Sequence, residues 1–372
     1  MEPVTHLLTG ACIGRAGLNR KTAYATLAAV LAAEAADLDM LWGFAGPVEE
    51  LKHHRGFTHS LLGAAVMAGV VAGGIWLGHL WRQRRRARKS TTPSRDGETL
   101  PPRQPVRWPW LYCTALLAAL SHVLLDWTNN YGVRPFLPFN ARWYAGSFMF
   151  VADPLLWALL LAALIMPWLL GLADREIGAR RKPFRGRGWA IFALSAMAAL
   201  GCLRWWQHAE AMTLAENSTI AAAPVTRIAA EPYPLNPFRW HVILETANFY
   251  QTAEVNTWTL SINSDPYRDV LYKPRATPAV EAARRSFLGR EYLNWGSWAV
   301  VRDVGQEPAP GMEPPKPPPG HEWTTVEFSD LRFRYSFLPN RGPASRSPLS
   351  GWVYIVDGHE VAGEAMDGKE QR

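Results

Sequence analysis

VADPLLWALLLAALIMPWLLGLA, residues 151–173, decides the fold class of this 372-residue chain. A helix crosses the apolar core of a bilayer with about 20 apolar residues. Three further stretches meet this requirement, at 60–81, 108–127 and 188–207. The tryptophans near the ends of the four stretches are typical of membrane–water interfaces. They are Trp76, Trp81, Trp108, Trp110, Trp127, Trp168, Trp189, Trp205 and Trp206. The sequence therefore predicts an all-α polytopic membrane domain with four spans.

Two shorter apolar stretches precede these spans. Residues 22–41 are alanine-rich, and residues 4–18 are too short to cross a bilayer directly. We expect the two stretches to form a helical hairpin, re-entrant or spanning, that turns at 17–21. The Gly-x-x-x-Gly spacing at 10–14 and the paired glycines of 69–73 favour close helix packing. A charged leader followed by a small-residue cleavage site is missing, so no cleavable signal peptide is expected.

Charge in the loops indicates the orientation. Loops 82–107 and 174–187 are rich in Lys and Arg, whereas 42–59 and 128–150 are poor in them. Basic loops stay in the cytoplasm, so the other two loops and everything after residue 207 are expected outside, on the periplasmic side of a bacterial inner membrane. The net charge of +7 also suits nucleic acid. Because basic loops beside spans already explain it, the bilayer is the expected partner and nucleic acid is not.

Residues after 207 change in character. Apolar and polar residues alternate over four stretches, which predicts strands; these are 239–250, 253–263, 323–336 and 351–357. Residues 278–294 resemble one short helix, and the proline-rich stretch 305–320 indicates a loop. We therefore expect a membrane domain over 1–207 and a small, mainly β external domain over 208–372. The three cysteines are far apart and imply no disulfide framework.

Two motifs carry the candidate chemistry. They are His53-His-Arg-Gly-Phe-Thr-His-Ser60, in which Thr58 can cap the following helix, and Ser121-His-Val-Leu-Leu-Asp126. His122 and Asp126 are four residues apart, so both side chains lie on one helix face. The orientation above brings further acidic and histidine side chains to the same membrane face. The resulting candidate metal ligands are His6, Asp39, His54, His59, His122, Asp126 and Asp153.

Some of these residues have a second interpretation. Asp153-Pro154 is typical of a helix N-cap with proline in the first turn, so Asp153, like His54, is an alternate ligand or a group that orients one. Asp37 is a candidate catalytic base or simply the polar end of a helix. Arg55 is a candidate for holding a phosphate or carboxylate, or else an anchor at the headgroups.

Mixed histidine and carboxylate ligands favour Zn²⁺, Mn²⁺ or Fe²⁺ over Ca²⁺ and Mg²⁺, with Zn²⁺ first. Such a metal activates water and polarises an ester or phosphoryl oxygen. The expected function is therefore metal-dependent hydrolysis of an ester or phosphoester, with a lipid as one candidate substrate. One alternative is a non-catalytic scaffold or envelope-integrity protein whose external domain binds partners. A proton-relay transporter fits less well, because transporter sites usually lie at the midplane.

At these residues the chain resembles the YdjM-like family of bacterial and archaeal membrane proteins. The resemblance covers about 1–207, and its ordered motifs are specific only when taken together. They are Thr5-His6, Asp37-Leu-Asp39, His54-Arg-Gly-Phe-Thr-His-Ser60, Ser121-His-Val-Leu-Leu-Asp126, Trp127-Thr-Asn-Asn-Tyr-Gly132 and Phe150-Val-Ala-Asp-Pro154. Ala36 replaces a proline usual in the family. The resemblance implies a metal-dependent hydrolase of the inner membrane. It also implies a distant similarity to zinc-dependent phospholipases C, whose downstream His and Glu ligands have no equivalent in this sequence.

Overall fold

The computed structural model describes residues 1–89, 104–176, 186–335, 337 and 347–371. Packing divides the chain into two compact units. The first comprises Met1–Leu38 and Arg55–Cys202, and the second comprises Asp39–His54 and Leu203–Arg372. Packing does not locate a bilayer surface, so the expected division at residue 207 stays a prediction. Much of both basic loops, namely 90–103 and 177–185, lies outside the described residues.

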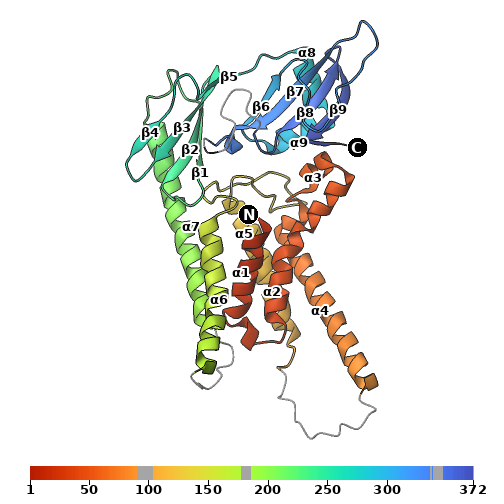
Figure 1. Cartoon of the computed structure of the whole chain (residues 1–372), viewed down its shortest axis with the longest axis vertical. Coiled ribbons are helices and arrows are strands. Elements are labelled where there is room, and N and C mark those ends of the chain that lie inside the picture. Colours follow the sequence, from red (N-terminus) through yellow and green to blue (C-terminus); the bar gives the residue numbers. More distant parts are fainter. Residues whose placement is uncertain (90–103, 177–185, 336, 338–346, 372) are drawn as a thin grey trace. The chain divides into compact units, whose positions relative to one another are not determined.

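Four helices in the described part of the chain are long and apolar enough to cross a membrane, which confirms the predicted spans (Figure 1). They are α4 (Leu61–Lys89), α5 (Trp108–Thr128), α6 (Pro154–Glu176) and α7 (Arg187–Glu216). Asp153 caps α6 as predicted, because its Oδ1 accepts from Leu155 N at 3.0 Å. The cap of α4 differs from the expectation. Ser60, rather than Thr58, supplies it, with Oγ accepting from Gly63 N at 2.9 Å.

The N-terminal stretches form the predicted hairpin. α1 (Pro3–Arg15) and α2 (Ala25–Glu34) are joined through a short 3-10 turn, Leu18–Arg20, and lie side by side. Gly10 and Gly14 permit this approach: a Cβ on Gly10 would lie 2.7 Å from a backbone oxygen of α2. At about 1.5 Å per residue, each helix alone is shorter than the ~30 Å of a bilayer core, and whether the hairpin re-enters or spans stays a prediction. The close helix packing expected at the glycines of 69–73 is not found at Gly73, because a Cβ there would meet nothing within 4 Å.

Small side chains form the interior of the first unit. The core between α2, α4 and α5 is mostly alanine, including Ala28, Ala32, Ala68 and Ala115, each with 0% exposure. A second core joins α1 to α6 and α7 and contains the buried Cys12. Cys113 and Cys202 are exposed. Alanines let helix backbones approach closely, as small residues do in membrane bundles. In this packing α2 contacts both α4 and α5.

The second unit is mainly β, as predicted. Its described strands form two five-stranded antiparallel sheets. The first sheet contains β1 (Arg227–Pro232), β2 (Arg239–Glu245), β3 (Phe249–Asn256), β4 (Ser261–Asn263) and β5 (Val270–Tyr272). The second contains β6 (Ala299–Asp303), β7 (Trp323–Asp330), β8 (Gly351–Val356), β9 (Glu360–Met366) and β10 (Lys369–Glu370). The proline-rich stretch 305–320 is a loop, as predicted.

The helix predicted over 278–294 is interrupted. The structure has α8 (Pro278–Arg285) and α9 (Phe287–Trp295) instead, because Ser286 adopts an extended conformation and caps α9 through a hydrogen bond from Gly289 N. In the same unit, α3 (Pro47–His53) packs against α9. A segment from the first extramembrane loop therefore belongs by packing to the C-terminal β region.

Candidate metal centre

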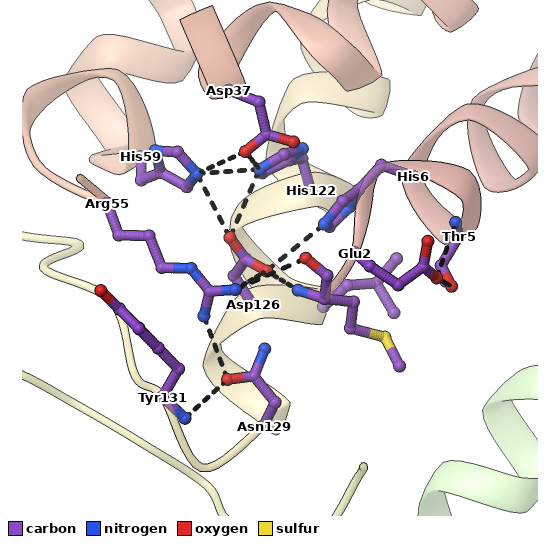
Figure 2. A network of polar contacts seen from close by, with 12 residues as sticks. Glu2, Thr5, His6, Asp37, Arg55, His59, His122, Asp126, Asn129 and Tyr131 are labelled. Atoms are coloured by element: carbon purple, nitrogen blue, oxygen red, sulfur yellow. Dashed lines mark hydrogen bonds and ion pairs between the residues drawn. The ribbon is translucent and has the colours of Figure 1, made fainter. Parts of the chain in front are cut away.

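Four side chains of the first unit point their polar atoms at one another (Figure 2). Asp37 comes from the 3-10 segment Ala35–Ala45 that follows α2, and His59 from the 3-10 turn Phe57–His59 that precedes α4. His122 and Asp126 come from the last two turns of α5. His59, His122 and Asp126 are buried, whereas the side chain of Asp37 is 14% exposed. Asp37 is therefore the member of this group that solvent reaches most easily.

The donor atoms of the four residues are close. His59 Nε2 lies 3.0 Å from His122 Nε2. Asp37 Oδ1 lies 3.3 Å from His59 Nε2 and 3.5 Å from His122 Nε2. Asp126 Oδ2 lies 3.2 Å from His59 Nε2 and 3.3 Å from His122 Nε2. Asp37 and Asp126 thus each place one oxygen near both imidazole nitrogens. The donor atoms of His59, His122 and Asp126 lie within 4.8 Å of one another, and so do those of His6, Asp37 and His122.

These separations fit a bound ion. Ligand atoms placed about 2.0–2.1 Å from a tetrahedral zinc ion lie about 3.3–3.4 Å apart. The five distances range from 3.0 to 3.5 Å and are close to five of the six edges of that tetrahedron, the sixth being the separation of the two carboxylate oxygens. The donor set also has the composition that zinc and related ions prefer. The residues present therefore suit a divalent transition metal.

Hydrogen bonds orient both imidazoles. His122 Nδ1 lies 2.5 Å from the carbonyl oxygen of Ala33. The carbonyls of the last turn of a helix have no partner within the helix, so the end of α2 offers this acceptor. Donation from Nδ1 leaves the lone pair of His122 Nε2 directed at the cluster, the usual arrangement of a ligating histidine. At the other ring, Thr58 Oγ1 is the hydrogen-bond partner of His59 Nδ1, at 3.2 Å.

The second oxygen of Asp126 faces a different set of groups. Oδ1 lies 3.1 Å from Arg55 Nη2 and 3.3 Å from His6 Nε2, and it also pairs with the amino group of Met1. Arg55 is 4% exposed, has a left-handed backbone (φ 51°) and lies over the ring of Tyr131 at 4.6 Å. Asp126 therefore presents one oxygen to the imidazoles and the other to a buried guanidinium.

Sequence reasoning did not assign roles to the residues that hold Arg55. Asn129 Oδ1 and the carbonyl oxygen of Gly132 each lie 3.0 Å from Arg55 Nη1, and Asn129 Oδ1 also accepts from Tyr131 N. These residues belong to the Trp127–Gly132 motif quoted above. Its polar residues directly after an apolar span were the signal that could have indicated them.

The remaining predicted residues have varied surroundings. His6 stacks on His122 with ring centroids 3.6 Å apart. Asp153 is fully buried at the cap of α6. Asp39 and His54 belong to the second unit, where Asp39 Oδ1 lies 3.2 Å from His54 Nδ1. The assignments of these residues as ligands, and of Arg55 as a substrate-binding residue, stay predictions.

The fold and this site define an integral membrane protein of several spans with a buried His–Asp cluster, joined to a mainly β region. The family model described as YdjM inner membrane protein matches residues 1–211, and the chain belongs to this family. A curated relative, "Uncharacterized protein YfhP" of Bacillus subtilis (strain 168), is 26% identical over 179 residues. That match covers 46% of this chain and 47% of the relative, so the two are alike over about half their lengths. No solved structure matches the chain.

Proposed function

We propose that this protein is a membrane-bound metal-dependent hydrolase. Asp37, His59, His122 and Asp126 hold one divalent ion in this proposal, with zinc preferred and Mn²⁺ or Fe²⁺ as substitutes. The observation that supports it best is the set of five donor–donor distances of 3.0–3.5 Å among four residues from three separate segments. Asp37 is included as a ligand on these distances, whereas the sequence had suggested it as a base.

A bound zinc ion would lower the pKa of water and polarise a substrate oxygen, which suits hydrolysis of an ester or phosphoester. The protein's own groups have separate tasks. Asp126 Oδ2 faces the imidazoles while Arg55 holds Oδ1, which fixes the carboxylate plane. Ala33 fixes the tautomer of His122. Asp37 uses Oδ1 toward the imidazoles, and we assign its other oxygen, Oδ2, which is buried, to accept a proton from the attacking water.

We further propose that the site faces the periplasm and acts on a lipid phosphoester or another ester at that surface. The cluster is formed at the end of the bundle where α4 begins and α5 ends. Arginines at the opposite end support this orientation: Arg15 ends α1, Arg82, Arg84 and Arg85 are near the end of α4, and Arg187 begins α7. Cytoplasmic ends of membrane helices carry such charges.

Metal content tests the site. The full chain is purified in detergent, and bound metals are measured by mass spectrometry. We expect about one equivalent of zinc per chain in the wild type and its loss in the His59→Ala/His122→Ala double variant, because two of four ligands are removed. His53→Ala is the matched control. This histidine is part of the same motif but contacts Glu49 at a half-exposed position of α3, so its loss should leave the metal unchanged.

Wild-type protein without metal, or a double variant that retains it, would contradict the site. Hydrolysis is tested separately with fluorescent phospholipids and chromogenic esters and phosphodiesters, before and after chelation. Turnover that a chelator abolishes and zinc restores is the expected result. A protein that binds zinc in this cluster but hydrolyses none of these compounds would contradict the hydrolase proposal while leaving the metal site intact.

A further inference from the structure

Two hairpin turns of the first sheet carry exposed apolar side chains. Leu235, in the turn between β1 and β2, is 56% exposed, and Trp258 and Leu260, between β3 and β4, are 75% and 63% exposed. Both turns lie at the same end of the sheet, because Arg239 pairs with Asn256 in the β2–β3 ladder. The rings of Phe238 and Trp258 are 5.2 Å apart. Leu235, Phe238, Trp258 and Leu260 thus form one patch, here called the turn patch.

The backbone at this patch is unfavourable for leucine. Leu235 and Leu260 have left-handed conformations, with φ of 64° and 52°. Glycine adopts this conformation freely, whereas it is unfavourable for other L-residues. Two positions thus combine an unfavourable backbone with an apolar side chain exposed at a turn. Contact of these two side chains with an apolar environment would offset both unfavourable features.

Hydrogen bonds within the second unit attach the turn patch to α7. Arg204 Nη1 donates to the carbonyl oxygen of Tyr233 at 3.1 Å, and Thr257 Oγ1 donates to Gln207 Oε1 at 2.5 Å. Arg204 is fully buried. One bond holds the first turn and the other holds the second. Figure 1 shows the sheet of β1–β4 beside this end of α7.

The attachment points flank a pair of tryptophans in α7. Trp205 and Trp206 lie between Arg204 and Gln207 and are 63% and 65% exposed. Tryptophans at the end of an apolar span mark the level of the headgroups. Residues 204–207 cover only about 5 Å of helix. The turn patch is therefore held at the depth where α7 leaves the bilayer, and it continues the aromatic surface of that helix.

We propose that the turn patch inserts into the headgroup region of the bilayer where α7 emerges, so that lipid contacts as well as α7 hold the β region to the membrane. Amphipathic elements that lie on a bilayer bury their apolar side chains about 5–10 Å into this region. The proposal is independent of the metal centre, because none of the residues involved belongs to it.

Fluorescent labels at single cysteines test the insertion. The full chain, with Cys113→Ser and Cys202→Ser, receives an environment-sensitive NBD label at Trp258→Cys. Tyr272→Cys is the matched control, since Tyr272 is 72% exposed and pairs with Phe249 at the other end of β3. Seven residues of strand, about 23 Å, separate that end from Asn256. Both proteins are reconstituted into phosphatidylcholine–phosphatidylglycerol vesicles.

We expect the label at 258 to lose emission when the vesicles contain a lipid with a nitroxide near its headgroup, and to be shielded from iodide present on both sides of the membrane. The label at 272 should respond in the opposite way. Equal responses at the two positions would overturn the proposal. It would also be overturned if the label at 258 were shielded from iodide yet insensitive to the nitroxide lipid, because protein, such as a second copy of the chain, would then cover the patch.

Discussion

Replacing Asp126 by Asn should destabilise the first unit even when no metal is present. The substitution keeps the shape of the side chain and removes its charge. Arg55 is then left as a buried cation without its carboxylate partner, 3.1 Å away in the wild type. Removing one partner of a buried ion pair costs about 3–5 kcal/mol. Arg55 keeps its contacts with Asn129 and Gly132, so we expect a loss of stability near ~3 kcal/mol, the lower end of that range.

The assay is reversible unfolding in detergent micelles, followed by tryptophan fluorescence with a chelator in every sample. The chelator removes any metal contribution, so the change in the free energy of unfolding reports the contacts of the Asp126 carboxylate with Arg55 and with the amino group of Met1. A double-mutant cycle with Arg55→Gln isolates the pair, because neither charge then remains. We expect a coupling energy of about 1–3 kcal/mol between the two substitutions.

Asp39→Asn is the control in the second unit. Asp39 is also buried, but its partner His54 is 20% exposed, so we expect a loss of at most ~1 kcal/mol. If Asp126→Asn costs no more than this control, or if its effect adds to that of Arg55→Gln without coupling, the interpretation of Asp126 as a carboxylate held by Arg55 is wrong.

Three further predictions concern other regions. Burial lowers the pKa of His241 to about 4, whereas an unfolded histidine titrates near ~6.5. As the pH falls, the unfolded state therefore binds the proton first, and the second unit should lose about 2 kcal/mol of stability between pH 7 and 5. Denaturant unfolding of the His241→Gln variant should lack this loss. If stability depended on pH in the variant as it does in the wild type, the prediction would be wrong. Gly10→Leu should cost about 1–3 kcal/mol in the same assay, because its Cβ would contact α2, whereas Gly73→Ala should be nearly neutral; equal effects would argue against close packing of α1 on α2. Tyr267→Cys, in the same cysteine background and at a position 93% exposed, should react with an impermeant maleimide in intact spheroplasts; reaction only after lysis would place the β region in the cytoplasm.

The sequence predicted the helical part of the fold well, because each span is a long apolar run and little else can satisfy its backbone in a bilayer. The β region was harder. β1 contains adjacent alanines, and β9 has Gly363 in its interior, so neither has the alternation that identifies a strand. The break at Ser286 depends on a cap, and a sequence pattern places such boundaries only approximately.

The candidate site was predicted as a set of residues but not as an arrangement. The sequence favoured Asp39 as a ligand and Asp37 as a base or the polar end of a helix. In the structure they lie in a 3-10 segment, where residues two apart differ by about 120° in direction and cannot face the same point. The carbonyl of Ala33 could not be found from sequence at all, because every residue has this group and only the fold selects one. Because this carbonyl belongs to the backbone, a substitution of Ala33 also leaves the hydrogen-bond acceptor in place.

The alanine core of the first unit affects how this membrane bundle can evolve. Burying alanine costs no side-chain rotamer entropy, so the helices associate without that loss. Alanine also has little volume to remove, and truncating mutations, the common cause of damage in a leucine-rich core, have almost no target here. Mutations that enlarge these positions should be the main cause of lost function. Random mutagenesis of α2 and α5 should therefore reveal intolerance to larger residues rather than to smaller ones.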